Sequence, residues 1–202
     1  MSNSIRTTAN ELIEAVVRQQ LQQLGTSVPG HIEAFDPATQ LAQLRIGVRT
    51  MAGEQLPTII ECPVMFSGGS SYVIEHQLDP GDEGIIIFSQ RCLDGWLETG
   101  GAAEQPVARL HDFTDAYFIP GIRPKPKAFP SMANEGIALR STDGSQYLWL
   151  KGNGSIEISG DVTVTGTISA PTIEASDSLK VASAEVKAHT HTVSGGNTGP
   201  LT

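Results

Sequence analysis

Between residues 136 and 173 the chain consists of short runs in which aliphatic and polar side chains alternate, separated by glycine-containing turns. Alternation with a period of two is typical of β-strands with one buried face, so Ile156 and Ile158 would share a face. Such short strands, apolar on one side only, are not stable as an isolated sheet. The segment therefore predicts strands that stack into a solenoid or wind around other copies of the chain. Disorder of a Ser-, Thr- and Gly-rich segment is the alternative, and the β-branched residues favour strands.

Two histidines, His189 and His191, lie near the end of the chain and are separated by one residue. On a strand they would point to the same side, but two imidazoles are too few to close a metal site. Three chains would supply the six nitrogen ligands of an octahedral ion, which fits iron(II) better than tetrahedral zinc. A fully ligated ion has no open position for substrate, so the pattern predicts a structural metal site at a threefold apex.

The N-terminal segment predicts an amphipathic helix that stops near Gly25. Its apolar residues recur at helical spacing, and its other side carries Glu, Arg and Gln. This apolar stripe needs a partner surface. Docking on its own domain and association with another chain both remain open. The stripe consists of Ile5, Leu12, Ile13, Val16, Val17, Leu21 and Leu24.

Residues 26–122 predict a small closed β-barrel, because about five apolar runs alternate there with turn signals. A hairpin is expected around the Asp36-Pro37 turn. Pro63 within an apolar run indicates an edge strand or a bulge. The two cysteines of the chain, Cys62 and Cys92, are expected as buried small hydrophobic residues.

The predicted fold class is mainly β: an N-terminal helix, a small closed barrel and a β-helix, formed as a solenoid or by strands wound around other copies of the chain. Three prolines between Arg123 and Met132 indicate a semi-rigid linker between barrel and β-helix. The expected segments are a helix (1–25), the barrel (26–122), the Pro-rich linker (123–133), the β-helix (134–188) and the metal-binding apex (189–202).

Composition excludes several classes of function. The net charge of −9 argues against nucleic-acid binding and against attraction to anionic membranes. Aliphatic runs are too short for a membrane-spanning helix. Charged residues interrupt the N-terminal apolar positions, so we expect no signal peptide and synthesis in the cytoplasm. No nucleophile, phosphate-loop or zinc-protease motif is found in the sequence, and we expect no catalytic activity.

Four stretches, in this order, resemble the central spike proteins of contractile phage tails, the baseplate assembly protein V type, which also occurs in phage-like bacteriocins. The first two resemble the barrel signature of that family, the third resembles its β-helix and the fourth its apex with paired histidines. They are residues 80–101 (PGDEGIIIFSQRCLDGWLETGG), 115–122 (DAYFIPGI), 154–173 (GSIEISGDVTVTGTISAPTI) and 187–200 (KAHTHTVSGGNTGP). Residues 174–188 depart from the family pattern because they lack the glycine-punctuated repeat.

The resemblance implies a homotrimer in which an OB-like barrel joins the tail hub or baseplate and an intertwined triple-stranded β-helix tapers to a point. In the family, the apex histidines of three chains bind one iron ion, here through His189 and His191, and smaller ions can lie on the axis. The expected function is mechanical piercing of the host outer membrane by a virion protein at the tip of the tail baseplate. A trimeric receptor-binding tail fibre or adhesin is the alternative.

Overall fold

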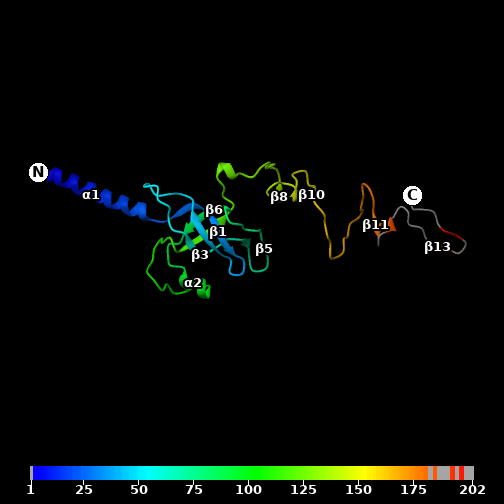
Figure 1. Ribbon diagram of the computed structural model, residues 1–202, viewed down its shortest axis with the longest axis horizontal. Helices are drawn as coiled ribbons and strands as arrows, with labels where there is room; N and C mark the ends of the chain where they lie inside the picture. Colours follow the sequence, from blue (N-terminus) through cyan, green and yellow to red (C-terminus); the bar gives the residue numbers. More distant parts are fainter. Residues whose placement is uncertain (1, 182–183, 186–191, 194–195, 198–202) are drawn as a thin grey trace. The chain divides into compact units, whose positions relative to one another are not determined.

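The computed structural model describes residues 2–181, 184–185, 192–193 and 196–197, and it is mainly β with few helices (Figure 1). It divides into two compact units, Met1–Phe129 and Pro130–Thr202. Their boundary lies within the segment predicted as a linker, 123–133. Among the described residues, no helix is both long enough and apolar enough to span a bilayer.

The first unit is built around one antiparallel sheet of five strands in the order β3-β2-β1-β6-β7. The sheet curls into a half-barrel (Figure 1), and its two edge strands meet through an isolated parallel bridge between Val64 and Phe118. There the Met65 N–H donates to the Phe118 carbonyl at 2.8 Å. The mainly β prediction is confirmed, and the predicted barrel is a curled half-barrel. Its strands are β1 (Ser27–Asp36), β2 (Leu41–Ile46), β3 (Ile59–Pro63), β6 (Glu83–Phe88) and β7 (Ala116–Pro120), beside a small pair, β4 (Ser67–Gly68) and β5 (Val73–Ile74).

Alternation along the strands places one set of side chains inside the half-barrel. In β2, Ala42, Leu44 and Ile46 are buried, while the residues between them are partly or fully exposed. Both cysteines are free and buried, as expected, and burial raises the pKa of Cys62 to about 12. The core consists of Ile32, Ala42, Leu44, Ile46, Ile59, Cys62, Val64, Ile86, Phe88, Ala116 and Phe118.

Two glycines pair across β1 and β6 where neighbouring atoms leave no room for a side chain. Gly30 lies opposite Gly84 in the register. A Cβ on Gly84 would lie 2.4 Å from the Ile119 carbonyl oxygen and 2.5 Å from the Phe118 ring. Such contacts are too short for a side chain, so the glycine at position 84 leaves room for the Phe118 ring in the core.

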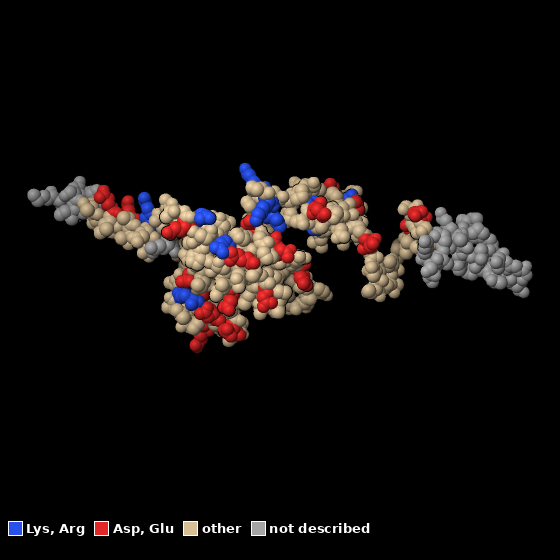
Figure 2. All heavy atoms as spheres, viewed as in Figure 1, with Lys and Arg blue, Asp and Glu red and all other residues tan. Residues whose placement is uncertain are grey.

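Local turn chemistry matches the sequence predictions. Asp36 ends β1, and its carboxylate accepts hydrogen bonds from the Ala38 N–H at 3.0 Å and the Thr39 hydroxyl at 2.8 Å, which closes the predicted hairpin. Pro63 is the last residue of β3, an edge strand. At this position a proline is tolerated although it has no backbone N–H to donate to a neighbouring strand. The half-barrel also carries the short helix α2 (Asp94–Thr99), and Asp and Glu side chains gather around it (Figure 2).

Helix α1 spans Ser2–Gln23, close to the prediction. Among its side chains that the structure describes, none is buried, and Leu12, Val16 and Leu21 are 66%, 49% and 64% exposed. The described part of the apolar stripe is therefore not covered by the half-barrel. Association of the stripe with another chain stays a prediction.

The second unit begins after a 3-10 turn, η1 (Lys125–Lys127), and contains a three-stranded antiparallel sheet in the order β10-β9-β8. Its turns fall at the predicted Asp143-Gly144 and Asn153-Gly154 pairs. The alternation predicted for residues 136–173 continues through Val162 and Val164, but residues 160–179 of the single chain contain no strand, so the prediction is wrong there. No neighbouring strand is present there to accept their backbone hydrogen bonds. The strands are β8 (Ile137–Arg140), β9 (Tyr147–Leu150), β10 (Ile156–Ser159), β11 (Lys180–Val181), β12 (Ala184–Glu185), β13 (Thr192–Val193) and β14 (Gly196–Asn197).

Candidate functional site

The predicted metal ligands His189 and His191 lie outside the described residues. Two other histidines, His76 and His111, have contacts within the half-barrel. The His76 ring lies 5.2 Å from the Phe66 ring, centroid to centroid. Nδ1 of His111 is 3.0 Å from the Gly25 carbonyl oxygen, where the chain leaves α1 for the half-barrel.

One face of the β8–β10 sheet is entirely aliphatic. The register places Ile137, Leu150 and Ile156 side by side across the three strands. The second row, two residues along each strand, is aliphatic as well, and residues two apart share a face. All six side chains are between 37% and 68% exposed, although aliphatic side chains are ordinarily buried. The six are Ile137, Leu139, Leu148, Leu150, Ile156 and Ile158.

The opposite face of the same sheet carries polar and aromatic side chains that satisfy one another. The Glu157 carboxylate accepts hydrogen bonds from the Tyr147 hydroxyl and from the Lys151 ammonium. The Lys151 Nζ also lies 4.8 Å from the centre of the Trp149 ring. The hydrogen bond to Glu157 raises the pKa of Tyr147 and of Lys151, and their two hydrogen bonds lower the pKa of Glu157. Only the aliphatic face therefore lacks a partner.

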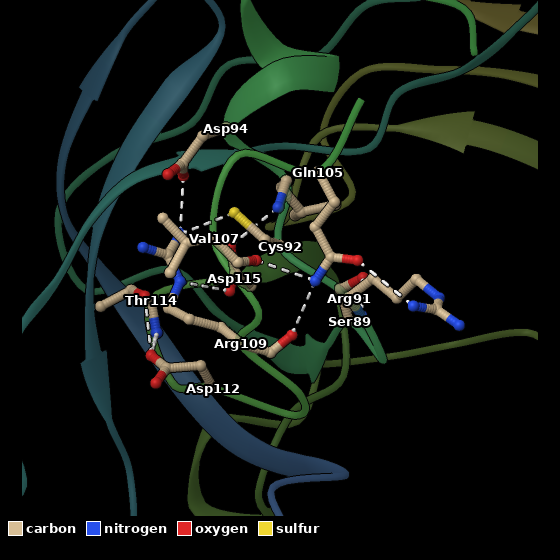
Figure 3. Close-up of polar contacts among 11 residues, drawn as sticks. Ser89, Arg91, Cys92, Asp94, Gln105, Val107, Arg109, Asp112, Thr114 and Asp115 are labelled. Carbon is tan, nitrogen blue, oxygen red and sulfur yellow. Dashed lines mark hydrogen bonds and ion pairs between the residues drawn. The ribbon is translucent and has the colours of Figure 1, made fainter. Parts of the chain in front are cut away.

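A second cluster joins the two ends of the long loop between β6 and β7 (Figure 3). Cys92 and Asp94 lie where this loop enters α2, and Asp115 directly precedes β7. The Arg109 guanidinium lies among them. Its Nη2 is 2.7 Å from an Asp94 carboxylate oxygen, 2.9 Å from Asp115 Oδ1 and 3.1 Å from the Cys92 sulfur, and its Nε is 2.9 Å from Asp115 Oδ2.

Asp115 is the only buried charged residue among those the structure describes, with 1% of its surface exposed. Burial opposes its ionisation, but the Arg109 guanidinium and the Leu93 N–H, which donates to Oδ1 at 2.8 Å, outweigh it and lower the pKa of Asp115. The hydrogen bonds to Asp115 and Asp94 raise the pKa of Arg109. The pair is thus charged at neutral pH.

The donor set of this cluster would otherwise suit a cation. Cys92, Asp94 and Asp115 offer ligand atoms within 4.8 Å of one another. The Arg109 guanidinium, however, already supplies the positive charge and the hydrogen bonds at their centre (Figure 3). We therefore interpret the cluster as structural. The cluster is not predictable from the sequence, because no spacing rule links four residues spread over a loop of this length.

A glutamine keeps the path of the same loop fixed. The Gln105 side-chain amide donates to the carbonyl oxygens of Val107 at 2.9 Å and Arg109 at 3.1 Å. Its oxygen accepts from Nη1 of Arg91 at 3.2 Å. These bonds place Arg109 so that its side chain reaches both ends of the loop (Figure 3).

Comparison with known proteins gives one family match. Residues 28–121 match the phage protein Gp138 N-terminal domain. The matched stretch begins in β1 and ends just after β7, so it coincides with the half-barrel and covers somewhat less than half of the chain. No curated protein matches the chain. The match supports a phage protein related to baseplates and spikes, without singling out the protein V type, and it suggests a structural component of the virion with a tail or baseplate role.

Proposed function

We propose that this protein is the central spike of a contractile phage tail or phage-like particle. In this proposal, the half-barrel attaches to the tail hub or baseplate, and the second unit pierces the host outer membrane when the tail contracts. Two observations support it: the phage-domain match over residues 28–121, and the aliphatic face of the β8–β10 sheet.

The aliphatic face is the observation that carries the proposal. Complete burial of an Ile or Leu side chain stabilises a structure by roughly 1.5–3 kcal/mol, and this sheet leaves six of them partly in water. Exposed apolar patches of this kind mark interfaces. In a homotrimer, three copies of the face would meet on the axis, while the satisfied Tyr147 and Trp149 face would point outward.

The apex belongs to the same proposal. His189 and His191 from three chains would hold one octahedral iron ion with a structural role. Because such an ion has no free coordination site, it would link the three chains and would not catalyse a reaction. A narrow tip of this kind would concentrate the force of contraction on a small area of membrane. The protein has a net charge of −9, so it would not be attracted to an anionic lipid surface.

Sedimentation equilibrium of the purified full chain tests the assembly. We expect a trimer, and a species of 21.4 kDa at micromolar concentration would contradict the proposal. Metal analysis should then give one iron per three chains. The double substitution His189→Ala and His191→Ala should remove the iron and leave the trimer, because the apolar face would provide the main interface.

The receptor-binding alternative predicts a different result. Purified trimer should bind intact host cells if the protein is a tail fibre or adhesin. A central spike should not bind them, and particles that lack it should still adsorb to the host but fail to infect.

A further inference from the structure

A groove of about 770 Å³ lies on the half-barrel between the β1–β2 turn, the edge strand β3 and helix α2. Its apolar wall includes Trp96 and Leu97, which are 43% and 40% exposed. The Trp96 ring packs edge-on against Tyr117, with ring centres 6.0 Å apart. The groove is thus a formed surface with an accessible aromatic side chain.

Two residues of the groove wall adopt left-handed backbone conformations that are uncommon outside glycine, Gln40 with φ 59° and Glu61 with φ 55°. Gln40 is fixed on both sides: its N–H donates to the Asp36 carbonyl at 2.8 Å, and its carbonyl accepts from the Val64 N–H at 3.1 Å. Glu61 lies at the irregularity in the β2–β3 pairing. The backbone there holds both side chains at the groove.

All charged residues that line the groove are acidic. Glu61, Asp94 and Glu98 line it, and its lining contains no Lys or Arg. Asp94 is neutralised by the ion pair with Arg109, but within the described part of the chain no ion pair involves Glu61 or Glu98. Figure 2 shows carboxylates over this part of the half-barrel. Two uncompensated carboxylates beside an exposed indole are complementary to a basic side chain.

We propose that this groove docks an extended segment of a neighbouring particle protein that presents Lys or Arg next to an aliphatic residue. The inference rests on the proposed function, because it names the surface by which the half-barrel attaches. A second copy of this chain fits less well. Its densest basic run, residues 123–127, already uses Arg123 and Lys127 in ion pairs with Asp82 and Glu83.

Photo-cross-linking in purified particles tests the groove. The change Leu97→p-benzoylphenylalanine places the probe in it, and Leu110→p-benzoylphenylalanine is the matched control on the same loop, 64% exposed and outside the groove. We expect irradiation to link position 97, and not position 110, to a different particle protein, with Lys or Arg in the linked peptide. A link to another copy of this chain, a linked peptide without a basic residue, equal linking from both positions or no link would overturn the inference.

Charge reversal gives an independent readout. Glu98→Lys should lower incorporation into particles roughly tenfold, since a like charge would face the basic segment. Glu54→Lys, which reverses an exposed carboxylate outside the groove, should leave incorporation unchanged. Equal incorporation of both variants would contradict the inference alone. Particles in which the wild-type chain is not found at all would contradict the proposed function as well.

Discussion

The half-barrel and the β8–β10 sheet share the same alternating pattern, but only the half-barrel buries its apolar residues. In β2, the apolar residues Ala42, Leu44 and Ile46 are at most 2% exposed. In β9, the equivalent residues Leu148 and Leu150 are 37% and 43% exposed. Alternation determines which face of a strand is apolar, but only a closed or covered sheet buries that face. The five-stranded sheet curls, so its apolar side chains pack against one another. The second sheet has three strands of four residues and is too small to bury its own apolar face in this way.

The largest effect is expected from a charge placed on the aliphatic face, which tests whether this face is buried in the trimer. Leu148→Asp should convert the trimer entirely to the single 21.4 kDa chain, because an unpaired carboxylate cannot be buried in the interface. Sedimentation velocity measures the change. Ala138→Asp puts the same charge on the opposite face and should leave the trimer intact. Dissociation of both variants, or of neither, would show that the aliphatic face is not the interface.

Truncation of the half-barrel core should act on stability instead. Phe118→Ala should lower the free energy of unfolding of the first unit by about 3–5 kcal/mol, because Phe118 is 0% exposed and fills the core. The two tryptophans of the chain lie in different units, so Trp96 fluorescence in a Trp149→Phe background reports the half-barrel. Ile158→Ala should leave that urea transition unchanged. A similar shift from both variants would contradict the independence of the two units.

The Arg109 cluster predicts a smaller, pH-dependent effect. Asp115→Asn should lower the free energy of unfolding by about 1.5–3 kcal/mol, the contribution of hydrogen bonds to a charged group. Because the pKa of Asp115 is lowered on folding, its stabilisation is present above the ordinary Asp pKa and is lost as pH falls through the folded pKa. Urea unfolding between pH 7 and 3 should therefore show a weaker pH dependence for Asp115→Asn. Asp177→Asn, exposed in the second unit, should match the wild type.

The smallest predicted effect compares two turns within the second unit. Asp143 accepts hydrogen bonds from the Ser141 hydroxyl and from the N–H and hydroxyl of Ser145, which lower its pKa to about 2. Asn153 accepts the same pair of bonds from Ser155 but has no charge to lose. Carboxyl carbon NMR should give a midpoint near pH 2 for Asp143. A midpoint in the ordinary Asp range would mean that these bonds do not form in solution.

Local patterns predicted most of the elements. The Asp36-Pro37 turn and the edge position of Pro63 follow from proline and from alternation, which act over a few residues. The closure of the half-barrel through Val64 and Phe118 was not predictable in this detail, because it joins residues far apart in the chain. No strand forms at Val162, although the alternating pattern is present there. The pattern is local, but the backbone hydrogen-bond partner of a strand must come from another segment.

The candidate sites divide in the same way. The histidine pair was found from spacing alone, and its metal remains a prediction. The aliphatic face followed from alternation, and the register added that all six side chains lie together. The groove and the Arg109 cluster depend on how a long loop returns to the sheet, so no local pattern could indicate them.

The Arg109 cluster also has a consequence for the order of assembly. A bound ion has a concentration that varies with its surroundings, and a chelator can remove it. A guanidinium tethered to the same loop as its carboxylates has a fixed, high effective concentration. The loop that carries the groove wall can therefore close as soon as the chain folds, before any neighbour arrives. A neighbouring protein would then meet a surface that is already formed.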